Sequence, residues 1–421
     1  MSPSEIAGRL LRWFILQEGW TRDSTALFAE MARGAPVVRF PQIPDAPGMW
    51  TVSRHDLVID ILNHSSFTTV EPKFPDPVRK KNPDFVEFFK KSLTFQASTD
   101  HRRLRGVLSG GFSARSLDRL RERTSALVDD LFAGLLADGG GDFVSKVAIP
   151  LPSLVTAALL DLPEEDWPMV TGWAQGMLAQ LSTGYLGMTA SVDPISVGQF
   201  RLLRSYVDDL VRQRANSKGS DVISRLAAAK AARQVSHEEV VDLVLLLFMT
   251  GVDTVTSGLS NSILCLLDRP EEWKRVQEDP GLCLAAFEES VRLLAPATFG
   301  VRTAREDVEF AGGIVRTGDV VMVAYAAANL DPRRFKDPLE FRWDRVQSTS
   351  LTFGHGRHYC LGARLGLLQG ELVLRKLAET KVALGTPSDA VMWRNDLAFN
   401  SPAQLWLQFG AQSVVACAGD V

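Results

Sequence analysis

The residues best suited to chemistry lie in the stretch FGHGRHYCLG, which runs from Phe353 to Gly362. Cys360, one of only four cysteines in the chain, follows Arg357 and His358 there. Positive side chains and the amides of a glycine-rich turn would stabilise a thiolate. Glycine also lets a flat ligand approach the backbone, because it has no Cβ. The stretch therefore predicts a functional thiolate rather than an ordinary buried cysteine.

Four interpretations of Cys360 remain open from these residues alone. The first is a buried structural cysteine. The second is a zinc ligand beside His355 and His358, for which the sequence offers no obvious fourth ligand. The third is a catalytic nucleophile, which needs a general base from elsewhere in the fold. The fourth is a thiolate ligand of a haem iron.

A second polar cluster interrupts the apolar helical segment VLLLFMTGVDTVTSGL, residues 244–259. It consists of Thr250, Gly251, Asp253 and Thr254. The simplest role for a buried threonine is a hydrogen bond to its own helix. A buried carboxylate, however, is costly unless it is paired, and a glycine inside a helix costs about 1 kcal/mol relative to alanine. The acid and the glycine therefore indicate a functional role for the cluster.

Two pairs of charged residues have spacings that place each pair on one helical face. Glu289 and Arg292 are three residues apart, and His101 and Arg105 are four apart. In isolation, the first pair would be an exposed ion pair worth little, and the second would be a solvated basic face. Their meaning depends on the fold that holds them.

These motifs, taken in order, resemble the cytochrome P450 family of the soluble bacterial type. Phe353, Gly356, Cys360 and Gly362 fill every defining position of the family's haem-binding signature. The resemblance implies that the cofactor is haem b and that Cys360 is the axial ligand of its iron. It also implies that Phe353 shields the sulfur, and that Gly354 leaves room for the cofactor.

The same resemblance assigns the charged residues to the cofactor and its support. His101, Arg105, Arg302 and His358 would bind the haem propionates, since charge-assisted hydrogen bonds are strong. A buried structural lock behind the haem would consist of Glu289, Arg292 and Arg345.

On the opposite face of the haem, the resemblance places the polar cluster of residues 244–259. Gly251 would leave room for dioxygen, Thr254 would donate a hydrogen bond to it, and Asp253 would relay protons. Thr250 stands where alanine is commonest in the family. The expected substrate pocket is mostly apolar, which suits a hydrophobic substrate, and it comprises Thr250, Ala297, Thr298, Phe299 and Phe399.

The elements that must position these residues are mostly helical. Apolar residues recur at three- and four-residue steps in 117–136, 200–211 and 365–377. Residues 48–54 and 308–325 have the β-branched content and turn residues of strands. We therefore expect a mainly α fold with a minor β region (α+β), in which a long central oxygen-binding helix crosses the haem. Residues 1–421 are expected to form a single domain.

Composition narrows the environment and the partners. A net charge of -4 and a pI near 6.0 give no reason to expect nucleic acid as a partner. The cysteines are too widely spaced for a disulfide framework, which favours a reducing compartment. The longest apolar run, Leu243 to Met249, is too short to span a bilayer. We expect a soluble, cytoplasmic protein that does not associate with a membrane.

The reaction implied by the resemblance is monooxygenation of a small organic, biosynthetic substrate by dioxygen. The sequence contains no dinucleotide fingerprint or cysteine cluster, so electrons would come from a separate ferredoxin and its reductase. The segment 72–91 has six lysines and arginines, which leaves open a substrate bound to an acidic carrier protein. The alternatives are a haem-thiolate peroxygenase, against which Asp253 and Thr254 argue, and a non-catalytic haem-binding protein.

Overall fold

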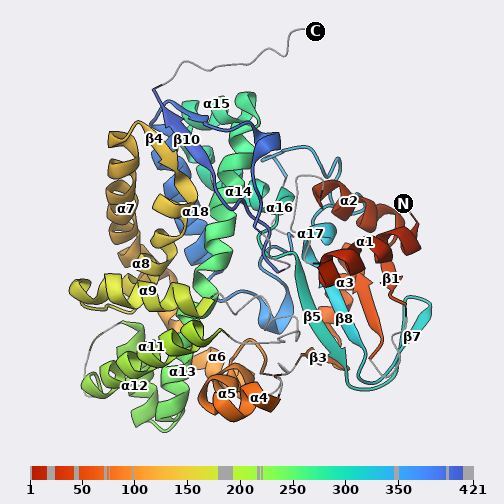
Figure 1. Ribbon diagram of the computed structural model, residues 1–421, viewed down its shortest axis with the longest axis horizontal. Helices are drawn as coiled ribbons and strands as arrows, with labels where there is room; N and C mark the ends of the chain where they lie inside the picture. The colour runs from red at the N-terminus through yellow and green to blue at the C-terminus, as the bar shows by residue number, and fades with distance from the viewer. Residues whose placement is uncertain are drawn as a thin grey trace.

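The computed structural model describes residues 2–16, 24–41, 47–70, 74, 76–96, 99–178, 193–215, 219, 221–345, 350–394 and 398–410. Within these ranges a large helical region lies beside a smaller β-rich region, drawn on the right of Figure 1. Helices α1 (Pro3–Leu16) and α2 (Ser24–Gly34) lie on the β-rich side. The expected α+β class is confirmed.

The α-helices follow the order of the chain. The remaining ones are α3 (His55–Asn63), α4 (Asp76–Lys81), α5 (Pro83–Lys91), α6 (Thr99–Ser109), α7 (Ala114–Ala137), α8 (Pro150–Leu159), α9 (Trp167–Leu178), α11 (Pro194–Gln213), α12 (Val222–Ala231), α13 (His237–Gly251), α14 (Asp253–Leu267), α15 (Pro270–Glu278), α16 (Cys283–Leu293), α17 (Tyr325–Ala328) and α18 (Ala363–Ala378).

The strands are short. They are β1 (Val37–Arg39), β2 (Met49–Val52), β3 (Phe67–Thr69), β4 (Gly140–Asp142), β5 (Phe299–Ala304), β6 (Val308–Phe310), β7 (Gly313–Val315), β8 (Val320–Ala324), β9 (Val382–Leu384) and β10 (Trp406–Phe409). The strand–turn–strand–turn–strand pattern expected for residues 308–325 is confirmed by β6, β7 and β8.

Five strands form the main sheet, in the order β1-β2-β8-β5-β3. Strands β2 and β8 are parallel, and β8 pairs with β5 in the antiparallel direction. The register places Arg302 of β5 opposite Val321 of β8. Strand β5 therefore carries Phe299 and Arg302 from the sheet to the wall of a central cavity.

The central apolar helix differs from its expected form. It is not one straight helix but two, α13 and α14, which meet at Val252. Ser236 begins α13 with a capping box, in which its hydroxyl and the carboxylate of Glu239 each satisfy a free backbone N–H. The stretch from His237 to Leu267 is long and apolar enough to cross a membrane, but 67% of its most apolar window is buried inside the protein. It is therefore best described as a core helix.

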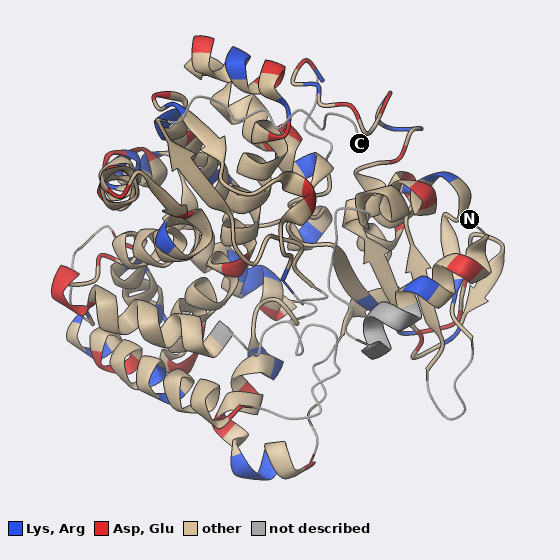
Figure 2. Ribbon diagram, turned by 45° about the horizontal axis from the view of Figure 1, so that its top comes forward, with Lys and Arg blue, Asp and Glu red and all other residues tan. Residues whose placement is uncertain are grey.

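Charged side chains of both signs are interspersed over the helices (Figure 2). The basic segment 72–91 is more ordered than a solvated lid, because its described part contains α4 and α5. Phe85, Phe88 and Phe89 of α5 are buried, and Phe200 of α11 packs against them. Lys80 and Lys81 remain exposed at the end of α4.

Candidate active site

A cavity of about 350 Å³ lies at the centre of the molecule, where α13, α14, α6, β5 and the segment before α18 meet. Of the residues that line it, none is an aspartate or a glutamate, whereas Arg105, Arg302, His101 and His358 all are present. Cys360 lies in the same wall. The cavity is therefore apolar with a localised excess of positive or positively chargeable groups.

The cysteine loop is held in shape by its own backbone. The amide of Cys360 donates to the carbonyl of Phe353 at 2.8 Å. Gly354 and Gly356 both have a φ of +70°, which residues with a Cβ rarely adopt. The loop ends where α18 begins at Ala363. The glycines of the motif are thus required by the backbone that carries the cysteine.

The protonation of Cys360 differs from the sequence-based expectation. Burial raises the pKa of its thiol, and a hydrogen bond with the backbone of Gly362 and the charge of Arg105 only partly oppose this rise. The sulfur faces the cavity, but protein surrounds it on its other sides. Arg357 and His358 do not stabilise the thiolate as the sequence suggested. A bound metal ion would do so, because coordination deprotonates a thiol.

The zinc interpretation finds no support. In the described ranges, which include His355, His358 and Cys360, no group of three or more His, Cys, Asp or Glu residues could hold a metal ion. A ligand that brings its own metal needs only one protein ligand on the iron.

The four basic residues expected at the cofactor are brought together. The imidazole rings of His101 and His358 lie 4.2 Å apart, between centroids. Arg105 donates to the carbonyl of Tyr359 at 2.6 Å. Burial, followed by nearby positive charges, lowers the pKa of His101 and lowers that of His358 to about 3. Both imidazoles are therefore neutral near pH 7 unless an anion joins them.

Arg302 makes the best case for an anionic ligand. It is 8% exposed, and the hydrogen bond it donates at 2.9 Å goes to the carbonyl of its neighbour, Val301. Within the described part of the chain, no carboxylate pairs with it. A buried guanidinium without an anion is costly, and haem carries carboxylates as its propionates. The residues present therefore fit haem, with Arg302 at the propionate end and Cys360 at the iron.

Sequence reasoning missed Tyr325, whose side chain lies beside Arg302. Its hydroxyl oxygen would lie 2.4 Å from a Cβ at Gly300, so that position admits only glycine unless the tyrosine moves. Burial raises the pKa of Tyr325, and the charge of Arg302 opposes the rise. A tyrosine at the end of a β-branched strand is an ordinary pattern, so no sequence signal marked it.

The polar cluster of the central helix lies partly in the cavity wall. Thr250, Gly251 and Thr254 line the cavity. The hydroxyl of Thr254 donates to the carbonyl of Thr250 at 3.1 Å, and that of Thr250 donates to the carbonyl of Leu246 at 2.9 Å. Both hydroxyls are thus bonded to their own helix, and each keeps an oxygen that can accept a further hydrogen bond.

Asp253 has a partner that the sequence did not reveal. Its carboxylate forms an ion pair at 3.0 Å with Arg394, which lies in the segment after α18. Asp253 itself is absent from the residues that line the cavity. The acid therefore lies next to the cavity wall, one residue from Thr254, and is held from outside.

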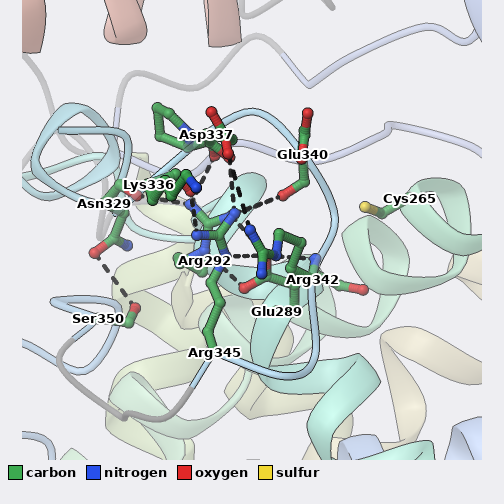
Figure 3. Close-up of polar contacts among 12 residues, drawn as sticks. Cys265, Glu289, Arg292, Asn329, Lys336, Asp337, Glu340, Arg342, Arg345 and Ser350 are labelled. Atoms are coloured by element: carbon green, nitrogen blue, oxygen red, sulfur yellow. Dashed lines mark hydrogen bonds and ion pairs between the residues drawn. The ribbon is translucent and has the colours of Figure 1, made fainter. Parts of the chain in front are cut away.

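The triad Glu289, Arg292 and Arg345 is assembled as expected (Figure 3). Arg292 donates to both carboxylate oxygens of Glu289 at 2.7 Å, and Arg345 donates to the same carboxylate at 2.9 Å. Glu289 and Arg292 are 5% and 2% exposed. The remaining donors of the two arginines bond backbone carbonyls of 329–340. The pair is thus buried and fully bonded, not exposed.

The expected substrate-pocket residues divide into two groups. Thr250, Ala297, Phe299 and Phe399 line the cavity. Thr298 does not: it is fully buried, and its backbone amide and hydroxyl donate to the carbonyl of Ala398. Neighbouring residues of an extended chain face opposite ways, which explains the difference. The predicted lining at 178–188 lies outside the described residues, and cavity residues that were not singled out include Leu246, Leu247 and Val291.

Comparison with known proteins agrees with this geometry. The family model described as Cytochrome P450 matches residues 199–280 and 282–380, which contain the polar cluster, the triad pair and Cys360. Biflaviolin synthase CYP158A1 of Streptomyces coelicolor is 32% identical over 388 residues, which cover 90% of this chain and 91% of that protein. The chain belongs to the cytochrome P450 family.

Further relatives support the assignment. The biotin biosynthesis cytochrome P450 of Bacillus subtilis is 29% identical, with 86% of this chain and 90% of that protein covered. The crystal structure of CalO2 matches with a TM-score of 0.80 and 29% identity, over 92% of this chain and 96% of that one. P450BioI, solved in complex with an acyl carrier protein carrying hexadec-9Z-enoic acid, has a TM-score of 0.82 and 26% identity, over 92% and 98%.

Cytochrome P450 enzymes are haem-dependent monooxygenases that use dioxygen and electrons from redox partners, and those of bacteria are mostly biosynthetic. The chain therefore belongs to a family of oxidoreductases, and the cofactor implied by the family is haem. The cavity, the single cysteine in its wall and the uncompensated arginines agree with that cofactor.

Proposed function

We propose that this protein is a haem b monooxygenase that oxidises a small, largely hydrophobic organic substrate in a biosynthetic pathway. The observation that carries the proposal is the shared cavity of Cys360 and Arg302, a thiol and a buried arginine that has no carboxylate partner in the described chain. When bound, haem supplies oxygen activation at its iron.

The proximal residues bind and orient the cofactor. Cys360 is proposed as the iron ligand, and Phe353 covers the sulfur. Arg105 and Arg302 would pair with the propionates, and an anion there would favour protonation of His101 and His358 by offsetting the positive charges that lower their pKa.

The distal residues handle protons. The hydroxyl of Thr254 faces the cavity and can exchange its bond to the carbonyl of Thr250 for a bond to a ligand at little cost. Asp253, one residue away, is proposed to return protons to that hydroxyl. Gly251 keeps the wall open, since a Cβ there would lie 3.4 Å from the hydroxyl of Thr156.

The proposed electron donor is a ferredoxin, supplied by its reductase, which docks on the face nearest Cys360. Arg357 and Arg364 are exposed there and would meet an acidic partner. Charge reversal at Arg364 should slow the first electron transfer. An unchanged rate would remove this part of the proposal. A reducing cytoplasm is the compartment that suits such partners.

Turnover separates this proposal from the two alternatives. With a ferredoxin, its reductase and NAD(P)H, the enzyme should consume dioxygen and form an oxidised product from a substrate that shifts the haem spin state. Product from hydrogen peroxide alone would favour a peroxygenase. Haem binding without product in either system would favour a non-catalytic haem-binding protein.

A further inference from the structure

Asn329 connects the buried triad to the loop that carries Cys360. It follows α17 and is fully buried. Its backbone carbonyl accepts a hydrogen bond at 2.9 Å from Arg292, so the triad holds its main chain. Figure 3 shows Asn329 between the triad and Ser350.

The side chain of Asn329 grips the segment just before the cysteine loop. Its Oδ1 accepts from the amide of Leu351 at 2.6 Å and from the hydroxyl of Ser350 at 3.3 Å. Its Nδ2 donates to the hydroxyl of Thr352 at 3.0 Å. The orientation of the amide is determined chemically, because the backbone N–H of Leu351 can only donate and therefore must face the oxygen.

The contacts of this segment continue directly to the sulfur. Thr352 also donates to the carbonyl of Val291, on the helix of the triad. The carbonyl of Leu351 accepts from the amide of Gly354, and the carbonyl of Phe353 accepts from the amide of Cys360 at 2.8 Å. A continuous set of buried hydrogen bonds therefore runs from Arg292 through Asn329 to Cys360.

We propose that Asn329 is a positioning residue that fixes the Cys360 loop on the triad and thereby sets where the sulfur meets the haem iron. This inference rests on the proposed haem function. Asn329 does not line the cavity, so it acts through Leu351 and Thr352 and has no contact of its own with the cofactor. Groups that orient a metal ligand typically change metal affinity by about 10- to 100-fold when they are removed.

Asn329→Ala in the haem-loaded enzyme tests the proposal. The variant should transfer haem to an excess of apomyoglobin about 10- to 100-fold faster than the parent protein. The fraction of the reduced, carbon monoxide-saturated enzyme that shows the red-shifted Soret band of thiolate ligation should also fall.

Asn261→Ala is the matched control. Asn261 is equally buried and donates to the carbonyls of Leu294 and Asn400 at 2.9 and 2.7 Å, but none of its bonds leads to the cysteine loop. It should lose a similar amount of stability while its haem transfer changes by less than about threefold. Equal acceleration in the two variants would overturn the proposal, since both residues would then be merely structural.

Thr352→Val provides a second test if Asn329→Ala does not fold. It is nearly isosteric and removes the acceptor of Asn329 Nδ2 together with the bond to Val291. Faster haem transfer would support the proposal, and transfer at the parental rate would overturn it. A parent protein that binds no haem would instead refute the proposed function itself.

Discussion

The proximal and distal sides of the cavity are built from different kinds of polar contact. On the proximal side, bonds join residues far apart in the chain, as when Arg345 meets Glu289 or Asn329 meets Leu351. On the distal side, Thr250 and Thr254 bond carbonyls four residues earlier in their own helix. Non-local bonds hold segments in place, whereas a local helix bond can be exchanged for a ligand without moving the backbone.

The difference teaches where each kind of substitution should act. Proximal changes should lower stability and haem retention, because they release whole segments. Distal changes should leave the fold intact and alter how electrons and protons reach product. Each prediction below would break or sharpen that division.

The largest expected effect is that of Glu289→Ala. Removing this carboxylate leaves Arg292 and Arg345 buried without their anion, which typically costs about 3–5 kcal/mol of unfolding free energy. Denaturant titration of the variant should show this loss, together with reduced haem content after purification.

Arg342→Ala is the control for that prediction. The side chain of Arg342 pairs with Asp344 near the surface, while its backbone amide supplies the bond to Glu289 and survives the substitution. A change within about 1 kcal/mol is expected. A comparable loss in both variants would contradict the special role of the buried triad.

Thr254→Ala should strike turnover rather than stability. Product formed per NAD(P)H consumed should fall by about 100-fold, the lower end for loss of a positioned proton donor, with the missing electrons recovered as hydrogen peroxide. Thr171→Ala is a matched control, because Thr171 makes the same kind of bond to Trp167, four residues earlier in α9. Both variants should unfold within about 1 kcal/mol of the parent protein. Undiminished coupling in Thr254→Ala would end the distal assignment.

Asp253 and Arg394 distinguish a proton relay from a structural ion pair. Asp253→Asn should slow product formation by about tenfold, since water can replace part of a relay. Arg394→Gln also breaks the ion pair but keeps the acid, so its rate should fall by less than about threefold. Equal losses in the two variants would show that only the ion pair matters.

The smallest expected effect is a pH dependence of the haem-free protein. The pKa of His358 is lowered from 6.5 to about 3 by burial and by positive neighbours, so the unfolded chain takes up the proton first. Stability is therefore complete above about pH 6.5 and falls as the pH drops toward about 3. The slope is at most about 1.4 kcal/mol per pH unit for this group.

Urea titrations of the haem-free protein between about pH 7 and pH 5 would measure this slope. His358→Gln should flatten it, and His64→Gln, at an exposed histidine, should not. Haem should also flatten it, because its propionates offset the positive neighbours. A steeper loss with haem bound would contradict the propionate assignment.

Much of the site follows from local sequence. Helical periodicity predicts α7 and α18, and the turn residues between 308 and 325 predict β6, β7 and β8, because these signals act over a few residues. The Glu289–Arg292 pair is likewise visible, since three residues make one helical step. The Cys360 loop is visible because its glycines are required by the backbone.

What could not be predicted depends on contacts between distant segments or on burial. The partner of Asp253 is 141 residues away along the chain. The bend at Val252 has no proline to announce it. The net effect of burial on the Cys360 thiol is set by the whole surrounding fold. Thr298 is different: the alternation of Ala297, Thr298 and Phe299 already implied that only two of them share a face.

The central claim is that Cys360 ligates a haem iron through its thiolate. The most direct measurement is the absorbance spectrum of the purified protein, reduced with dithionite and saturated with carbon monoxide, compared with that of Cys360→Ser. The account predicts a strongly red-shifted Soret band in the parent protein that is absent from the variant. A parent protein that neither carries nor takes up haem, or a band unchanged in the variant, would contradict it.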